Sequence, residues 1–304
     1  CVANQNRNTD LDECDYTASG TEFDLTASSD NCGITSTTYE LSGATTIAET
    51  SGTTLDGIDF NTGVTTVTWR VYDAATNTTS CSFTVTVTDN QAPAFTVPAN
   101  DTICRFLNCT YDIDPSITGD VTDEWDNCAA GIEAYVFDDD FTNLIDCDNF
   151  GYIIRTWRLE DGNGNYTDHE QLIYIEPVPK VILVPQADTL CNNETTNISI
   201  TSVTNSIYPV RFRYTIKPDY PDSVNITYNG PQTGLVITDI IADNIENISW
   251  EAQRVLFIVT PYSVDGSDAE RCSGINDTTV VWVEPTPEIR VSADTVVCNS
   301  EPTT

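Results

Sequence analysis

The sequence has a single histidine and few basic residues. His169 stands alone among 304 residues, and 12 Lys and Arg face 47 Asp and Glu, a formal net charge of −35. A histidine-based catalytic triad could rest only on His169, and no GxSxG motif accompanies it. With so few cations to neutralise phosphates, we expect no nucleic-acid partner and no attraction to an anionic membrane surface. We therefore expect no enzyme activity and a solvated, acidic surface.

Long apolar runs are also missing. No stretch reaches the roughly 18 apolar residues that a membrane-spanning helix needs, so we expect no direct membrane insertion. The chain opens without a signal peptide, within what reads as one module, and it ends just after another module begins. We therefore expect it to be a segment of a longer protein.

The 11 cysteines contain no CxxC pair. Zinc sites need such pairs or Cys/His clusters, so zinc is disfavoured. Cysteines scattered through an acidic chain rich in threonine instead indicate disulfides. We expect a location in an oxidising compartment outside the cytosol.

Two stretches of the chain repeat each other. Residues 65–89 read TTVTWRVYDAATNTTSCSFTVTVTD, and residues 153–177 read IIRTWRLEDGNGNYTDHEQLIYIEP. They align without a gap, and the matched pairs are Trp69 with Trp157, Arg70 with Arg158, Asp73 with Asp161, Asn77 with Asn165 and Thr79 with Thr167. Such a match predicts an array of similar modules.

Apolar and polar residues alternate in the clearest segments. Phe83, Val85 and Val87 alternate with threonines, which is the pattern of a strand with one buried face. No segment of helix length shows a helical period. The predicted fold class is all-β, a linear array of tandem immunoglobulin-like antiparallel β-sandwich domains. Trp69 and Trp157 are expected in the cores, and Trp125 is a weaker core candidate that could contact a ligand.

Proline-containing segments predict the module boundaries. DNQAPAFTVPAN occupies residues 89–100, and EPVPKVILVP occupies residues 176–185 and is echoed at 284–291. Proline cannot join a central strand ladder, so these segments are expected as links. The predicted modules are residues 1–90, 91–178, 179–285 and the start of a further one at 286–304.

These boundaries lead to disulfides paired within modules. His169 occupies the repeat position of Cys81, so Cys128 is expected to pair with Cys147, which stands nearer in the chain. The predicted pairs are Cys1–Cys14, Cys32–Cys81, Cys104–Cys109, Cys128–Cys147 and Cys191–Cys272. Cys298 repeats the position of Cys191 and is expected to pair with a residue beyond 304.

The first module, with DNCG at residues 30–33 and the stretch 65–93, resembles the HYR (hyalin repeat) domain, an immunoglobulin-like sandwich. The second resembles a divergent HYR relative. The third, and the start of the fourth, resemble the PKD-like repeats of Bacteroidota surface proteins. Arrays of this kind are typical of very large adhesins that the type IX system exports, including those of gliding motility. The resemblance implies an extracellular, cell-surface location.

The resemblance also implies a modification. Bacteroidota attach O-glycans to Thr or Ser in Asp-Thr/Ser motifs followed by a small or aliphatic residue. The matching positions here are Thr102, Thr189, Ser223, Thr278 and Thr295.

The DGNGN segment, residues 161–165, looks like the opening of a calcium-binding loop. Its oxygen ligands would come from Asp161, Asn163 and Asn165. Tyr166 and Leu172 stand where such a loop needs Gly and Glu, so a hairpin turn is the favoured interpretation. A second acidic group lies at Asp138 and Asp140. No cofactor is expected, and calcium is left open.

We therefore predict a structural stalk segment of a long extracellular adhesin that serves gliding motility or surface attachment. Its expected partners are further repeats of the same chain, and also surface polysaccharide or other cell-surface proteins. The alternatives are a module that itself binds glycan or protein, which an exposed aromatic cluster would favour, and an accessory domain of a secreted enzyme.

Overall fold

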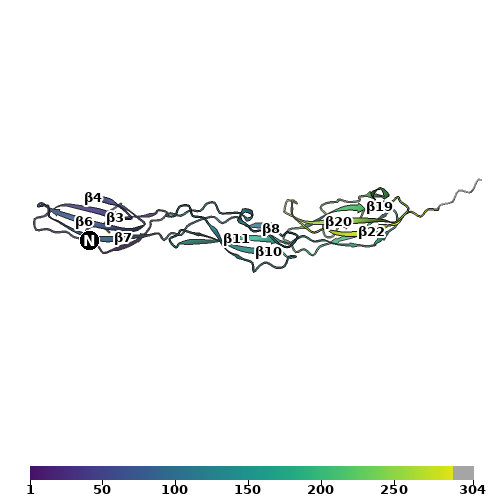
Figure 1. Ribbon diagram of the computed structural model, residues 1–304, viewed down its shortest axis with the longest axis horizontal. Helices are drawn as coiled ribbons and strands as arrows, with labels where there is room; N and C mark the ends of the chain where they lie inside the picture. Colours follow the sequence, from purple (N-terminus) through teal and green to yellow (C-terminus); the bar gives the residue numbers. More distant parts are fainter. Residues whose placement is uncertain (290–304) are drawn as a thin grey trace, which may run out of the picture. The chain divides into compact units, whose positions relative to one another are not determined.

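The computed structural model describes residues 1–289 as an all-β chain (Figure 1). Its strands form β-sandwiches in tandem, which confirms the predicted fold class. Within these residues the only α-helix is the single turn α1 (Pro115–Thr118). Residues 290–304 of the predicted start of a further module, with Thr295 and Cys298, lie outside the described residues.

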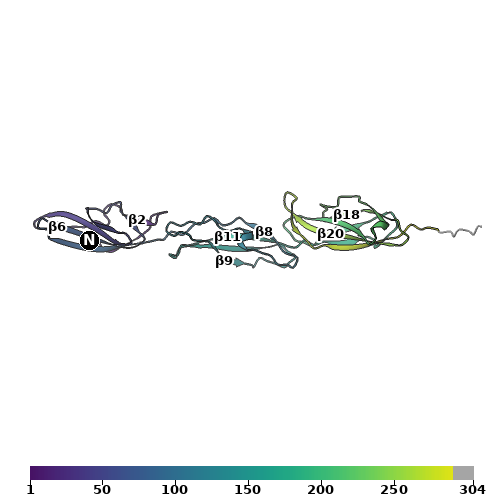
Figure 2. The same cartoon turned by 45° about the horizontal axis from the view of Figure 1, so that its top comes forward.

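A five-stranded sheet dominates the first 90 residues. Its order is β1-β7-β6-β3-β4, and the pair β2–β5 forms a smaller second sheet. The strands are β1 (Gln5–Asn8), β2 (Asp15–Thr17), β3 (Ile34–Gly43), β4 (Ile47–Ser51), β5 (Asp59–Asn61), β6 (Gly63–Asp73) and β7 (Thr78–Thr88). Viewed after a turn of 45°, β2 lies away from the sheet that holds β6 (Figure 2). The sheet is antiparallel except at its edge, where β1 runs parallel to β7.

The core of this sandwich follows the alternation in the sequence. Val67 and Trp69 on β6, and Phe83 and Val85 on β7, are all buried, while the threonines between them are more accessible. The indole N–H of Trp69 donates to the carbonyl of Phe23 at 3.0 Å, so the one polar atom of the ring is satisfied inside the core. The predicted core role of Trp69 is confirmed.

The same hairpin recurs in a four-stranded sheet of order β8-β11-β10-β9. Its strands are β8 (Asp101–Cys104), β9 (Tyr135–Asp140), β10 (Gly151–Glu160) and β11 (Tyr166–Glu176). Trp157 is 1% exposed, as predicted, and its indole N–H donates to Gln171 at 3.1 Å. The Gln171 amide in turn donates to the carbonyls of Ala99 and Thr118 at 3.0 and 2.7 Å. Gln171 thus connects the tryptophan to two backbone segments that no strand pairing holds.

The rest of the described chain contains three further sheets. They are β13-β22-β20-β16, with β21 on β20, and the three-stranded sheets β12-β15-β18 and β14-β19-β17. The elements are β12 (Ile182–Pro185), β13 (Thr189–Leu190), β14 (Glu194–Thr195), β15 (Ile198–Thr201), β16 (Val210–Pro218), the 3-10 turn η1 (Pro221–Ser223), β17 (Val224–Thr227), β18 (Ile240–Ile241), β19 (Asn244–Asn247), β20 (Gln253–Val264), β21 (Glu270–Ser273) and β22 (Asp277–Val283). Phe212, Ile245 and Phe257 lie fully buried in a shared apolar core.

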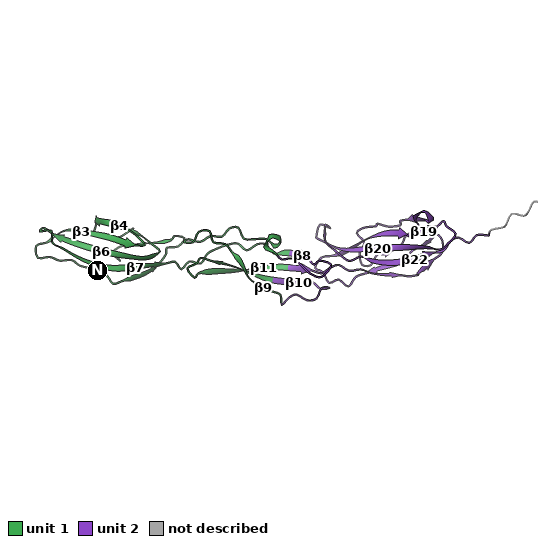
Figure 3. Cartoon of the chain, viewed as in Figure 1, with its two compact units in different colours: residues 1–101, 114–141, 154–173 green, residues 102–113, 142–153, 174–304 purple. Residues whose placement is uncertain are grey.

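The chain divides into two compact units (Figure 3). One comprises residues 1–101, 114–141 and 154–173, and the other comprises residues 102–113, 142–153 and the chain from 174 onward. Strands β8, β10 and β11 pass from one unit into the other. Every sheet nevertheless stays within one of the ranges 1–90, 91–178 and 179–285. The module boundaries expected from the sequence remain a prediction.

Residues 1–289 contain four disulfides, and the predicted pairs Cys1–Cys14, Cys32–Cys81, Cys104–Cys109, Cys128–Cys147 and Cys191–Cys272 are wrong. The bonded pairs are Cys1–Cys81, Cys14–Cys128, Cys104–Cys272 and Cys109–Cys147. Cys32 and Cys191 are exposed free thiols. The prediction paired cysteines within modules, largely by nearness along the chain, whereas a disulfide requires Cα atoms about 5.5 Å apart in space.

Strand pairing explains the first bond. The parallel register of β1 on β7 places Gln5 beside Val85, and continuing it four residues back places Cys1 beside Cys81. Sequence analysis missed this because β1 is short and polar and carries no hydrophobic pattern. Cys14 and Cys104 likewise bond to cysteines 114 and 168 residues further along the chain, in the next predicted module.

Candidate functional site

The DGNGN turn between β10 and β11 is built around the Asp161 side chain. One oxygen of its carboxylate accepts the backbone N–H groups of Asn163, Gly164 and Asn165 at 2.7, 3.1 and 3.1 Å. The other accepts the Asn165 side-chain amide at 2.5 Å. Gly162 and Gly164 both adopt positive φ, which glycine does at little cost. The predicted hairpin turn is therefore confirmed.

The first repeat forms the same turn. There Asp73 accepts the backbone N–H groups of Ala75 and Asn77 at 2.8 and 2.9 Å, and the Asn77 amide at 2.7 Å. Asp73 is partly accessible, whereas Asp161 is only 7% exposed. The two turns thus share the hydrogen bonds that the aspartate accepts within the turn, and they differ in how far other parts of the chain bury that aspartate.

Two further aspartates cover Asp161. Asp89 directly follows β7, in the segment that leads out of the first sandwich. Asp126 opens the DNC sequence of residues 126–128, which repeats the DNC of residues 30–32. One oxygen of Asp126 accepts the backbone N–H groups of Cys128 and Ala129 at 2.9 and 2.7 Å. Asp89 and Asp126 are 6% and 8% exposed.

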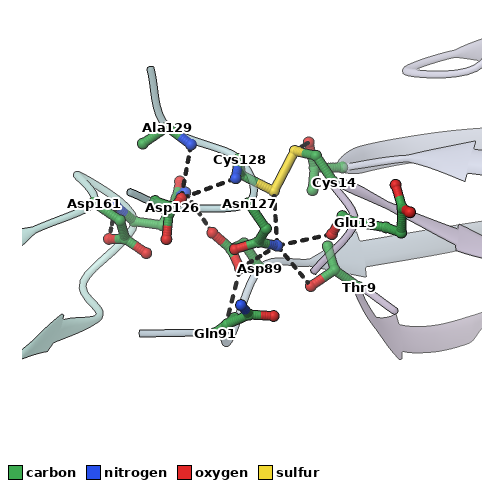
Figure 4. Close-up of a disulfide and its surroundings, with 12 residues drawn as sticks. Thr9, Glu13, Cys14, Asp89, Gln91, Asp126, Asn127, Cys128, Ala129 and Asp161 are labelled. Carbon is green, nitrogen blue, oxygen red and sulfur yellow. Dashed lines mark hydrogen bonds between the residues drawn. A yellow bond between two sulfur atoms is a disulfide. The ribbon is translucent and has the colours of Figure 1, made fainter. Parts of the chain in front are cut away.

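The three carboxylates converge, as Figure 4 shows beside the Cys14–Cys128 disulfide. Asp89, Asp126 and Asp161 each offer an oxygen within 4.8 Å of the other two. The Asn127 amide reaches back to the carbonyl of Glu13 at 2.7 Å, and the Asn165 amide approaches the carbonyl of Asp89 at 3.3 Å. Parts of the chain far apart in sequence therefore meet at one cluster of acidic oxygens.

Burial would by itself raise the pKa of the Asp161 carboxyl. The hydrogen bonds that it accepts from Asn165, Asn163 and Gly164 outweigh the burial, and the pKa lies below its ordinary value. Asp161 is therefore ionised at neutral pH. A set of oxygen donors with negative charge is the set that binds a hard divalent cation.

Of the predicted calcium ligands, only Asp161 belongs to this cluster. Asn163 and Asn165 act on it as hydrogen-bond donors, through the contacts given above. Asp138 and Asp140 lie on strand β9, not in a loop, and the neighbouring Asp139 forms an ion pair with Arg155 at 2.8 Å. Sequence reasoning missed Asp89 and Asp126, although the recurrence of the DNC sequence at residues 126–128 is a signal that could have pointed to Asp126.

The remaining candidates lie apart from the cluster. Thr189 and Thr278 are exposed, whereas Thr102 and Ser223 are partly accessible. His169 is an exposed residue of β11 whose ring lies edge-on to Phe95 at 4.9 Å. Trp125 is 45% exposed, and its backbone pairs with Ala94.

Known proteins resemble the chain in part. Residues 13–87 match the HYR domain. No curated protein matches the chain. The solved structures similar to it include mouse cadherin-23 repeats EC22–24, at 13% identity and a TM-score of 0.38, covering 93% of this chain and 96% of that one. The human desmocollin-1 ectodomain is also similar, at 12% identity and a TM-score of 0.37, and the match covers 94% of this chain and 61% of that one.

The predicted resemblance of the first module to HYR is thus confirmed. Together with the four disulfides, it identifies an extracellular repeat region of immunoglobulin-like sandwiches. Among residues 1–289 no helix has the length and apolar character needed to cross a membrane.

Proposed function

We propose that this region is a load-bearing stalk segment of a cell-surface adhesin. The observation that carries the proposal is the pattern of the disulfides. Cys14–Cys128 joins the predicted module 1–90 to the module 91–178, and Cys104–Cys272 joins the latter to the module 179–285. Consecutive sandwiches are therefore linked by a second covalent connection besides the chain itself.

These bonds limit how far the chain can lengthen under tension. The shortest covalent path from Cys1 runs to Cys14, crosses to Cys128, returns to Cys104 and crosses to Cys272. This path to residue 289 holds about 60 residues, which extend to at most about 200 Å, against about 1000 Å for the chain without disulfides. Such a chain keeps its length even when individual sandwiches unfold.

The acidic composition and the accessible Asp-Thr motifs suit a crowded cell surface. A net charge of −35 keeps neighbouring copies apart, and glycans on Thr102, Thr189, Ser223 and Thr278 would add to that effect. In this proposal the partners are further repeats of the same chain and surface polysaccharide or proteins, and the whole serves attachment or gliding.

Single-molecule pulling from both ends tests the mechanical role. We expect the oxidised chain to lengthen by less than a quarter of what the reduced chain releases. Equal lengthening of the oxidised and the reduced chain would overturn the proposed role as a load-bearing stalk. Antibody labelling of intact cells tests the location, and labelling that appears only after permeabilisation would overturn a cell-surface role.

A second candidate, glycan binding, is favoured by one specific observation. Tyr135 and Phe137 on β9, and Tyr166 on β11, are 44%, 50% and 53% exposed, and β10 with Arg158 lies between these two strands. The Arg158 guanidinium lies 3.6 Å from the ring centre of Phe137 and 4.2 Å from that of Tyr166. Exposed rings held rigidly beside charged groups are a suitable surface for stacking a sugar.

Binding of the full chain to purified surface polysaccharide tests this candidate. We expect Tyr166→Ala to weaken binding roughly two- to tenfold, because a stacked ring contributes about 0.5–1.5 kcal/mol. Tyr220→Ala is the matched control, since Tyr220 is 67% exposed but lies outside this cluster. Unchanged binding by Tyr166→Ala would dismiss the candidate.

A further inference from the structure

The carboxylates of Asp89, Asp126 and Asp161 are buried together without a compensating cation from the protein. None of the ion pairs that the structure shows within residues 1–289 includes any of the three. Like charges at this spacing repel one another, and burial weakens the screening by water. The cluster therefore costs stability unless a positive charge joins it.

Two oxygen atoms at the cluster have no partner. Asp126 Oδ2 and Asn127 Oδ1 are buried, and neither accepts a hydrogen bond from any described residue. The other oxygen of Asp126 is held by two backbone N–H groups, so the carboxylate is fixed with Oδ2 free. Asp126 as a whole is 8% exposed, and its carboxylate points toward Asp89 and Asp161 (Figure 4). A buried acceptor left unmatched in this way calls for a ligand.

The chemistry of the donors selects the ion. They are carboxylate oxygens, with an amide oxygen nearby, and the adjacent sulfurs of Cys14 and Cys128 are bonded to each other. Calcium binds oxygen at 2.3–2.6 Å, so oxygens on opposite sides of one ion lie up to about 5 Å apart. The 4.8 Å spread of the three carboxylates fits that geometry. Magnesium demands shorter distances and a strict octahedron, which three separate loops supply less readily.

We propose that Asp89, Asp126 and Asp161 bind one Ca²⁺ ion, with Asn127 Oδ1 as an additional ligand. The ion connects the segment that leaves β7 to the DNC loop and to the turn between β10 and β11. These are the parts that Cys14–Cys128 also ties together, so the metal neutralises the cluster and stiffens the same joint.

The first repeat provides a matched control. Asp30 opens the first DNC motif and accepts the backbone N–H of Cys32 at 2.7 Å, as Asp126 does with Cys128. Asp30 is exposed, whereas Asp126 is buried in the cluster. Asp30→Asn therefore repeats the chemical change of Asp126→Asn without touching the proposed site.

Calorimetric titration of the full chain with CaCl₂, and thermal melting with CaCl₂ or EGTA, test the proposal. We expect a site whose affinity falls at least about tenfold in Asp126→Asn and is unchanged in Asp30→Asn. In EGTA, Asp126→Asn should melt above the wild type, because it removes a buried charge, and CaCl₂ should reverse that order. A wild type that binds no Ca²⁺ at millimolar concentration, an Asp126→Asn chain that binds like the wild type, or an equal response to MgCl₂ would each overturn it.

Discussion

Cys14 and Cys128 are bonded to each other, with their Cα atoms 4.7 Å apart although the two residues are 114 positions apart in the sequence. Cys14 immediately precedes β2, and Cys128 lies in the loop whose Asp126 joins the carboxylate cluster. The bond therefore fixes the first sandwich to the loop that carries two of the proposed calcium ligands, Asp126 and Asn127.

Loss of this bond should destabilise the protein strongly. Closing a loop of that length lowers the entropy of the unfolded chain, and on that model the double variant Cys14→Ser/Cys128→Ser loses about 5 kcal/mol. Denaturant unfolding followed by tryptophan fluorescence measures the loss. Cys32→Ser serves as the control, since Cys32 is an exposed free thiol, and should change the free energy of unfolding by less than about 0.5 kcal/mol. Equal losses would contradict the pairing.

Replacement of Gln171 by leucine should cost about 3 kcal/mol. Gln171 is fully buried, and its loss leaves the Trp157 indole N–H and the carbonyls of Ala99 and Thr118 without partners. Phe83 holds the same position in the first repeat, where Phe83→Leu should cost less than about 1.5 kcal/mol. Thermal melting of both variants makes the comparison, and a smaller loss for Gln171→Leu would show that the network is dispensable.

Stability should depend on pH through Glu176. Burial raises the pKa of this carboxyl, although the Ser206 hydroxyl, the Ile207 N–H and the charge of Arg271 act against it. Because the pKa is higher in the folded than in the unfolded protein, the folded protein holds the Glu176 proton more tightly. The resulting contribution to the free energy of unfolding is fully present below the unfolded pKa and is lost as pH rises through the folded pKa. Glu176→Gln should therefore gain stability relative to the wild type between about pH 4 and neutral pH. A pH-independent difference in melting temperature would contradict this assignment.

Gly43 should tolerate no side chain. A Cβ atom there would lie 2.3 Å from the carbonyl oxygen of Val64, and φ is +108°, which other residues rarely adopt. Gly43→Ala should cost at least about 2 kcal/mol. Gly57→Ala is the control, because Gly57 has φ +76° but open space around its Cβ position, and should cost only about 1 kcal/mol. Equal costs in chemical denaturation would show that the contact with Val64 is unimportant.

The repeated hairpin could be predicted because its signals are local. Alternation over Phe83, Val85 and Val87 specifies a half-buried strand, and the Asp and Asn of the turn bond their own backbone. The edge strand β1 could not be predicted, because its residues QNRN have no apolar alternation and its parallel pairing with β7 depends on the completed sheet. Because this strand was not predicted, Cys1 and Cys81 were wrongly assigned to other partners, although they are bonded to each other.

The carboxylate cluster was predicted only in part. The DGNGN segment pointed to Asp161 because its residue types are those of a calcium loop. Asp89 and Asp126 carry no such local pattern, and their distances from Asp161 depend on how the segment after β7 and the loop around Asp126 pack against the turn between β10 and β11. Local resemblance identified one ligand, and tertiary contact selected the other two.

The amino-acid sequence by itself determined the all-β class, the repeat and the buried tryptophans, because periodicity, turn chemistry and apolar alternation act over a few residues. The tertiary structure alone decided which cysteines bond and which carboxylates meet. Those contacts join residues up to 168 positions apart, and at such separations only the folded backbone determines which side chains come within bonding distance.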